Sequence, residues 1–296
     1  MARGSHSAHA SLARLIGRYA DGVRHAADRA ARNLGPDNVH DLRVATRRLR
    51  AVLKAFHAEL DQSGLEELNF DLASLTRETG PLRDADVRRR LLMPLISHSM
   101  DLAPDARRNC AIALEEARTD ARRELRLRVR DVPWQERMAR IRAGARDGRL
   151  VKPLSRPLAQ LVGQFLYGQL RDLRRRMGRR RLDPRRLHRL RVRIRNTRYA
   201  VEAMLPLVRL PRDPLAKSLR RLQDLLGVAH DLTEAQRFLA IDPLPGNIGA
   251  TLADFLDASA AARLRDCRRR LHALAIEPPA EWQRWLARKT QKGNLG

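Results

Sequence analysis

Residues 39–56 have the sequence VHDLRVATRRLRAVLKAF, which combines a regular apolar pattern with a regular basic one. At about 100° per residue, a helix places the leucines and valines on one side and the basic residues within an arc of about 80° on the other. The pattern predicts an amphipathic helix with one face toward a core and a row of positive charge opposite. We call this row the first basic column; it consists of His40, Arg43, Arg47, Arg50 and Lys54.

The same skeleton returns 148 positions later, where residues 187–204 have the sequence LHRLRVRIRNTRYAVEAM. Glu202 stands at the position that Lys54 occupies in the first copy. The basic face therefore either ends one turn earlier than in the first copy or contains an internal ion pair between Arg198 and Glu202. We call this face the second basic column; it consists of His188, Arg191, Arg195 and Arg198.

Further landmarks recur at nearly the same spacing. Trp134-Gln135 and Trp282-Gln283 are 148 positions apart, which is half of the 296 residues. The sequence therefore indicates a duplicated unit. We expect a disordered N-terminus over residues 1–10, a first helical bundle over 11–148 and a second over 149–296. Four further pairs recur at an offset of 147: Leu72/Leu219, Leu75/Leu222, Gly80/Gly227 and Asp84/Asp231.

Helical periodicity dominates the chain, and strand-like alternation of apolar and polar residues is missing from the sequence. We predict an all-α fold of two bundles packed about an approximate twofold axis. Pro36 and Pro184 are expected to be first residues of the two column helices. The other predicted helices cover residues 11–33, 65–80, 84–98, 104–129, 215–227, 231–240 and 248–275.

Gly80 and Gly227 follow leucine-rich helical patterns, and an aspartate comes four residues after each. Glycine commonly ends a helix, and aspartate commonly caps the start of the next one. We therefore predict that each glycine ends a helix and that Asp84 and Asp231 begin new ones. Glu234 would complete a capping box with Asp231.

The charge is strongly unbalanced. The net charge is +26, charged residues make up 32% of the chain, and only five of the 60 basic residues are lysines. A coding bias toward arginine would raise the total, but it would not select one helical phase. Because so much like charge repels itself, and because arginine binds phosphate through two N–H groups, the composition predicts a polyanionic partner.

Other functional classes lack support in the sequence. Cys110 and Cys267 have no second cysteine at metal-ligand spacing, which indicates core thiols of a reducing compartment. The longest apolar run, residues 91–96, is too short to span a membrane. Phosphate-binding glycine loops, zinc-binding His-Glu-x-x-His helices and acidic metal clusters are missing. We therefore expect a cytoplasmic protein with no membrane partner, cofactor, metal or catalytic activity.

The two basic columns resemble the signatures of the CHAD family, the conserved histidine α-helical domain, as does the stretch LQDLLGVAHD at residues 222–231. The resemblance covers about residues 8 to 290. It implies two four-helix bundles around a central basic cavity that binds inorganic polyphosphate, and association with polyphosphate granules. Members of the family often accompany a triphosphate-processing domain of the CYTH type, which is missing from this sequence. The resemblance therefore implies binding without catalysis.

Position by position, the resemblance assigns both basic columns to the ligand. Asn196 and Thr197 depart from the more basic and apolar residues that the family has there, which affects local packing more than charge. The third-helix signatures imply an additional rim around the cavity. The rim residues are Arg77, Arg83, Lys217, Arg220, Arg221 and His230.

Four alternatives remain open at this level. A basic face can be a solvated surface, although the only acid within 39–56 is Asp41, which lies off the column. His40 and His188 can instead be buried hydrogen-bonding residues. A nucleic acid also presents a row of phosphates, but aromatic residues make up only 4% of the chain and Tyr199 alone flanks a column. A metal-dependent or phosphate-processing enzyme is the fourth alternative, but the sequence lacks the phosphate-binding and metal-binding motifs typical of such enzymes.

Overall fold

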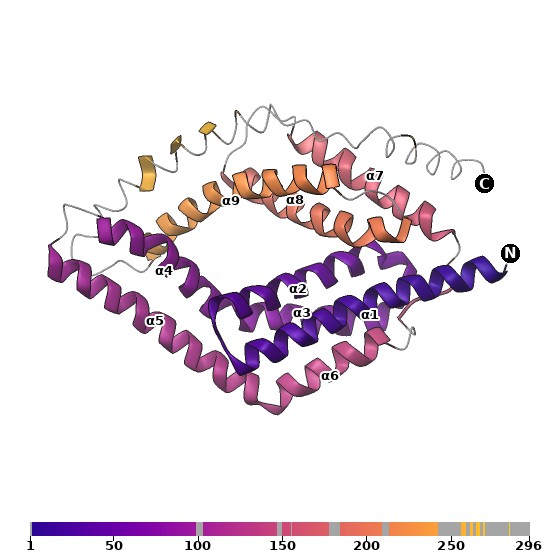
Figure 1. The fold of residues 1–296 in the computed structure, drawn as a ribbon, viewed down its shortest axis with the longest axis horizontal. Coiled ribbons are helices and arrows are strands. Elements are labelled where there is room, and N and C mark those ends of the chain that lie inside the picture. The colour runs from indigo at the N-terminus through magenta and orange to yellow at the C-terminus, as the bar shows by residue number, and fades with distance from the viewer. Residues whose placement is uncertain are drawn as a thin grey trace.

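The computed structural model describes residues 2–98, 103–146, 150–154, 156–177, 184–208 and 213–241, together with a few isolated residues from 256 onward. Within these ranges the fold is all-α, as predicted, and the only extended pairing is an isolated bridge between Leu60 and Val151 (Figure 1). Two short 3₁₀ helices, His57–Glu59 and Leu205–Val208, follow the column helices. The α-helices are α1 (Ala2–Arg32), α2 (Pro36–Ala55), α3 (Gln62–Glu78), α4 (Gly80–His98), α5 (Pro104–Arg130), α6 (Val132–Arg146), α7 (Leu158–Met177), α8 (Pro184–Met204) and α9 (Asp213–Ile241).

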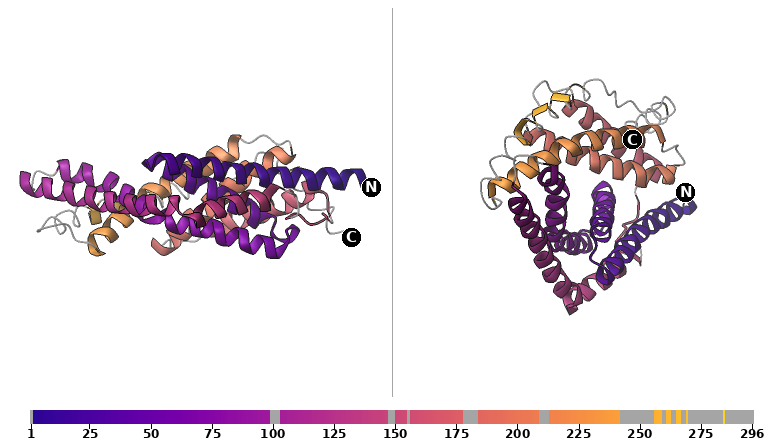
Figure 2. Two further views of the ribbon diagram at one scale, coloured as in Figure 1. Left: turned by 90° about the horizontal axis from the view of Figure 1, so that it is seen from below. Right: turned by 60° about the vertical axis from the view of Figure 1, so that its left-hand side comes forward.

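The two column helices pack against each other. α2 lies between α1, α3 and α8, while α8 also packs on α7 and α9. One large hydrophobic core receives side chains from each of the helices α1 to α9. A smaller apolar cluster joins the α4–α5 pair to α9 at the other end of the molecule (Figure 2). Segments 148 residues apart in the sequence are thus brought side by side.

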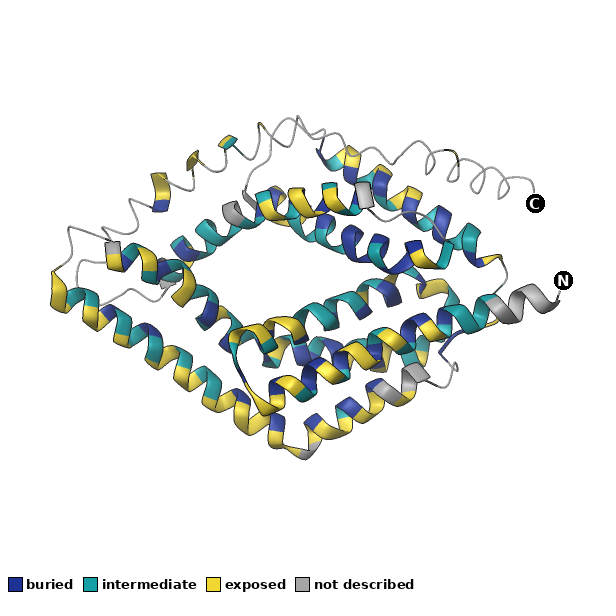
Figure 3. Ribbon diagram, viewed as in Figure 1, coloured by how far each residue is buried: buried dark blue, intermediate teal, exposed yellow. Residues whose placement is uncertain are grey.

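The predicted apolar face of α2 is confirmed. Leu42, Leu49, Val52 and Leu53 are each at most 1% exposed, and buried and exposed residues alternate around the helix (Figure 3). Fully burying such a side chain stabilises the fold by about 1.5 to 3 kcal/mol. Pro36 is the first helical residue, as expected. α2 is therefore held by its apolar face, and its basic face does not contribute to the core.

The N-terminal prediction is corrected by the structure. α1 begins at Ala2, so residues 2–10, which we expected to be disordered, are helical. The ring nitrogen Nε2 of His9 lies 2.9 Å from the carbonyl oxygen of Val151, and Ala8 packs against the main core. His9 and Val151 are 142 positions apart, so the local sequence could not reveal this contact.

The predicted helix boundaries at the glycines are also wrong. α3 ends at Glu78 with Thr79 as its cap, and Gly80 is the first residue of α4, which places Asp84 inside that helix. α9 continues through Gly227 and Asp231 without a break. A glycine inside a helix costs only about 1 kcal/mol, which burial of leucines on the same helix can offset.

Much of the second half beyond α9 lies outside the described residues. The predicted helix over 248–275 and the Trp282-Gln283 landmark fall there, apart from isolated positions. The two-bundle division at residue 148 and the approximate twofold axis therefore stay predictions. Among the described helices, none combines the length and apolar character that crossing a membrane requires.

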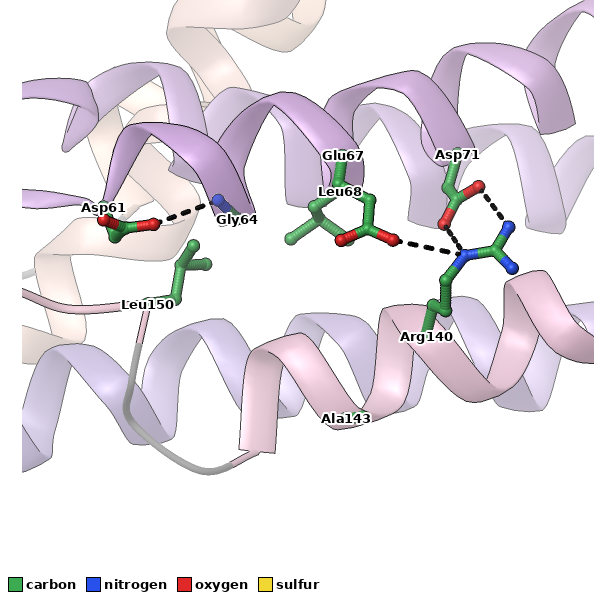
Figure 4. A pocket seen from close by; sticks show the side chains of 8 residues that line it. All are labelled: Asp61, Gly64, Glu67, Leu68, Asp71, Arg140, Ala143 and Leu150. Carbon is green, nitrogen blue, oxygen red and sulfur yellow. Dashed lines mark hydrogen bonds and ion pairs between the residues drawn. The ribbon is translucent and has the colours of Figure 1, made fainter.

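A cavity of about 250 Å³ lies between α3 and α6. Figure 4 shows the carboxylates of Asp61, Glu67 and Asp71 along it, with Arg140 reaching across from α6. Arg140 donates from Nε and Nη2 to the two oxygens of the buried Asp71, at 3.0 and 2.9 Å. This cavity lies at the junction of two helices, and carboxylates outnumber arginines in its lining. It is therefore unsuited to binding an anion.

We expect Asp71→Asn to destabilise the protein by about 2 to 3 kcal/mol, because it removes a buried carboxylate that receives a bidentate arginine. Urea unfolding followed by circular dichroism measures the change. Glu67→Gln is the matched control: Glu67 is 65% exposed and lies 3.6 Å from Arg140, so its loss should cost less than about 0.5 kcal/mol. Equal effects of the two substitutions would contradict this account of the α3–α6 junction.

Candidate functional site

Arginines from the two column helices converge where α2 and α8 pack. Burial, followed by the positive charges of Arg47 on α2 and of Arg191, lowers the pKa of Arg195 on α8 to about 10. Burial and Arg47 also lower the pKa of Arg191, while Asp231 opposes them. We call Arg47, Arg191 and Arg195 the central arginine cluster. A positive charge lowers the pKa of a neighbouring arginine because the two cations repel each other, so these arginines lie close together despite their like charge.

The central arginine cluster also has unmet hydrogen-bonding capacity. The Nε–H groups of all three arginines are buried and have no acceptor among the residues that the structure describes. A buried donor without a partner costs roughly 1 to 3 kcal/mol. The three side chains thus carry both excess charge and unused donors, a combination that an anion would relieve.

Among the described residues, and unlike the members of the central arginine cluster, Arg43 is held by hydrogen bonds to a neighbouring helix. Its Nη1 donates to the carbonyl oxygen of Thr76 at 2.7 Å and to Oγ1 of Thr79 at 3.2 Å. These acceptors lie at the C-terminal end of α3, where the helix dipole favours a cation. Burial lowers the pKa of Arg43, and Arg47 lowers it further. Arg43 therefore links α2 to α3 while remaining within electrostatic reach of Arg47.

The end of the first basic column opens into a cavity of about 490 Å³ between α2, α3, α7 and α8. Arg47, Arg50 and Lys54 line it from α2, and Arg195 lines it from α8. We call it the column-end cavity. A volume of this size lies within the range of small-ligand sites, and all the charged residues that line it are basic.

Two further basic residues line the column-end cavity, and the sequence did not single them out. His57 follows α2, and Arg193 lies on α8, where its Nε is 2.8 Å from Oδ2 of Asp172. Arg193 is about 200° around the helix from Arg191, so a projection of one helix places it off the column. Only the packing of α7 beside α8 reveals that it faces a cavity.

A second cavity, of about 500 Å³, surrounds the start of α2 and contains His40 and Arg83. Its other arginines are largely neutralised. Nε of Arg118 lies 2.8 Å from Asp86, and Nε of Arg89 lies 2.8 Å from Glu115. Burial lowers the pKa of His40, and Arg83 and Arg47 lower it further. The first column thus begins in a mixed-charge cavity and ends in a basic one.

Two histidines of the second half lie together. The ring centroids of His188 on α8 and His230 on α9 are 5.0 Å apart. The pKa of His230 is lowered to about 4, first by burial and then by the charges of Arg191, His188 and Arg195. His230, predicted as a rim residue, therefore lies beside the central arginine cluster.

Arg198 forms hydrogen bonds and an ion pair with other residues of the protein. Its Nη1 lies 2.6 Å from Oε1 of Glu202, its Nε donates to Oε1 of Gln223 at 3.0 Å, and the residue is only 7% exposed. The internal Arg198–Glu202 pair, which the sequence left as one of two possibilities, is confirmed. The second column therefore ends at Arg195 as far as free charge is concerned.

The remaining rim residues lie in different surroundings. Arg83 on α4 acts electrostatically on His40 and Arg43. Arg77 donates to Ser74 on its own helix, Arg220 lies 3.9 Å from Glu202, and Lys217 and Arg221 are exposed on α9. The structure thus connects Arg83 and His230 with the cluster, and a ligand contact by the other four stays a prediction.

Fold and site define an all-helical protein in which two packed helices direct arginines toward each other. The sequence profile of the CHAD domain matches residues 14–240, so the chain belongs to the CHAD domain family. None of the curated proteins matches it.

Two solved structures share the fold. The crystal structure of the CHAD domain from the plant Ricinus communis is 22% identical, with a TM-score of 0.73 over 91% of this chain and 93% of that chain. PptA from Streptomyces chartreusis is 18% identical, with a TM-score of 0.69 over 90% of this chain and 98% of that chain. At these identities the likeness concerns the fold alone.

The lowered pKa of His230 predicts pH-dependent stability. Between about pH 4 and pH 6.5 an unfolded chain binds a proton at His230 that the folded protein does not. The free energy of unfolding should therefore rise with pH across this window, by up to about 1.4 kcal/mol per pH unit from this residue. Urea titrations at pH 4.5, 5.5 and 6.5 should show a shallower rise for His230→Gln. The exposed His25→Gln is the control, and an unchanged slope in His230→Gln would contradict the assignment.

Proposed function

We propose that the protein binds inorganic polyphosphate along the contact between α2 and α8, and that it associates with polyphosphate granules in this way. The observation that carries the proposal is the central arginine cluster. Arg47, Arg191 and Arg195 combine mutual repulsion with buried N–H groups that have no acceptor among the described residues. Phosphate oxygens supply negative charge and acceptors together.

A chain of phosphates suits the site better than a single anion. His40 and Lys54 are 14 residues apart on α2, which corresponds to about 21 Å of helix. Cations along this length reach from the mixed-charge cavity, past the cluster, to the column-end cavity. A polymer can neutralise them all at once and release its condensed counterions, which makes binding strongly dependent on salt.

The proposal contains no catalytic step. The residues of the central arginine cluster hold phosphate through guanidinium groups, which remain protonated at neutral pH and do not exchange a proton with a ligand. A general acid or base needs a pKa near the working pH, and the pKa of His230 lies well below that range. The chemistry of these residues therefore supports binding rather than turnover.

Polyphosphate should outcompete nucleic acid at equal phosphate concentration. Tyr199, the aromatic residue beside the second column, is only 3% exposed, so it offers no open face on which a base can stack. Phe165 lines the column-end cavity but is partly buried against the main core. Fluorescence anisotropy with labelled polyphosphate, competed by duplex DNA and single-stranded RNA, makes the comparison. Displacement by either nucleic acid as effective as that by unlabelled polyphosphate would favour a nucleic-acid-binding function instead.

The double substitution Arg47→Gln and Arg195→Gln should weaken polyphosphate binding by about 100-fold, because each arginine makes a charge-assisted contact worth about a factor of ten. The same double variant should raise the free energy of unfolding without ligand by about 0.5 kcal/mol, because like charges no longer repel. Calorimetric titration and urea unfolding measure the two effects.

The matched control is Arg123→Gln with Arg126→Gln, which removes the same charge from the exposed face of α5. It should change binding by less than about threefold at physiological salt, where distant surface charges are screened. If the control weakened binding as much as the cluster variant, polyphosphate would be attracted by net charge alone. The proposed site would then be wrong.

A further inference from the structure

Glu202 lies at the centre of an ion-pair network beside the proposed site. Its Oε1 is 2.6 Å from Nη1 of Arg198 on α8 and 3.9 Å from Nη2 of Arg220 on α9, and its Oε2 is 3.7 Å from Nη2 of Arg48 on α2. One carboxylate thus faces arginines from three helices. The side chain is 19% exposed, so the network lies at the edge of the protein interior.

The sequence repeat shows what this carboxylate replaces. A shift of 148 positions turns Arg47, Arg50 and Lys54 into Arg195, Arg198 and Glu202. The first three line the column-end cavity, and every residue lining that cavity is basic, neutral or apolar. In the second set, the residue at the Lys54 position is an acid that binds the preceding arginine. The C-terminal ends of the two column helices are therefore chemically unequal.

The Arg198 guanidinium is enclosed as well as neutralised. Its side chain is 9% exposed, Gln223 accepts from its Nε at 3.0 Å, and its Cζ lies 4.7 Å from the centroid of the Tyr199 ring. Arg48 lies 5.6 Å from the same ring on the other helix. A phosphate at this end would have to displace a short, partly desolvated carboxylate contact, which is among the stronger interactions in proteins.

We infer that Glu202 withholds Arg198, Arg48 and Arg220 from polyphosphate, so that the bound chain contacts the central arginine cluster and the first basic column but not these three arginines. The inference rests on the proposed function and adds a determinant of where the ligand lies. Glu202 competes with phosphate for the N–H groups of Arg198, Arg48 and Arg220. It does not touch the ligand, and it acts by withholding these arginines.

Neutralising Glu202 should lengthen the binding surface. Glu202→Gln is expected to strengthen binding of long-chain polyphosphate about tenfold, since at least one arginine becomes available for a charge-assisted contact. The slope of log Kd against log salt should become steeper by about one unit, as for one additional phosphate contact. Glu116→Gln, which removes an exposed carboxylate from α5, is the matched control and should give neither effect.

A double-mutant cycle with Arg198 tests the mechanism in the full-length protein. Arg198→Gln alone should change polyphosphate affinity by less than about twofold, because its charge is already neutralised, but it should abolish the gain that Glu202→Gln produces. Calorimetric titration gives the affinities, and thermal unfolding checks that each variant is folded. If Glu202→Gln does not fold, the nearly unchanged affinity expected for Arg198→Gln still tests the inference.

The outcomes separate the inference from the proposed function. If the wild-type protein does not bind polyphosphate, both fail. If it binds but Glu202→Gln behaves like Glu116→Gln, or if Arg198→Gln alone weakens binding tenfold, the proposed function is still supported. The inferred role of Glu202 is then contradicted. A gain in Glu202→Gln that disappears in the double variant supports the inference.

Discussion

The crowding of Arg47, Arg191 and Arg195 is the constraint on which the rest of the structure depends. Burial and repulsion from neighbouring arginines lower the pKa of Arg195 to about 10. The folded protein therefore holds these positive charges close together against their electrostatic repulsion. Helix packing supplies the compensating force. Leu49 on α2 and Leu190 on α8 are buried on other sides of the same two helices, so each helix is fixed by its apolar side while its basic side holds repelling charges.

Such an arrangement is typical of a binding site, since residues that bind a ligand are often unfavourable for stability when the ligand is absent. The structure also limits how far the strain extends. Glu202 neutralises Arg198, and Thr76 and Thr79 accept hydrogen bonds from Arg43. The unpaired charge is thereby concentrated at the centre of the α2–α8 contact and in the column-end cavity. Position along the column, rather than total charge, decides which arginines are available.

The sequence predicts those parts of the fold that depend on local periodicity. The buried face of α2, its start at Pro36 and the all-α class follow from helical phase and the residue types at helix ends. The continuous α9 could not be predicted, because its buried leucines outweigh the local signals of Gly227 and Asp231. Near the start of α1, His9 contacts Val151, a residue from a distant part of the sequence that local periodicity does not indicate.

The candidate site shows the same division. The spacing of the columns identifies Arg47, Arg191 and Arg195, because each lies on the basic face of its own helix. It cannot identify Arg193 and His57, since they line a cavity that exists only when α7 and α3 pack beside the columns. The spacing also does not decide whether Arg198 pairs with Glu202. Residues four positions apart on a helix can form an ion pair, but their side chains need not do so.

A crystal structure of the protein with bound polyphosphate tests the central claim most directly. The account predicts a chain of phosphate density between α2 and α8, with oxygens within hydrogen-bonding distance of the Arg47 and Arg195 guanidinium groups. Phosphates found only on the outer faces of α1 or α5, with the central arginine cluster untouched, would contradict it.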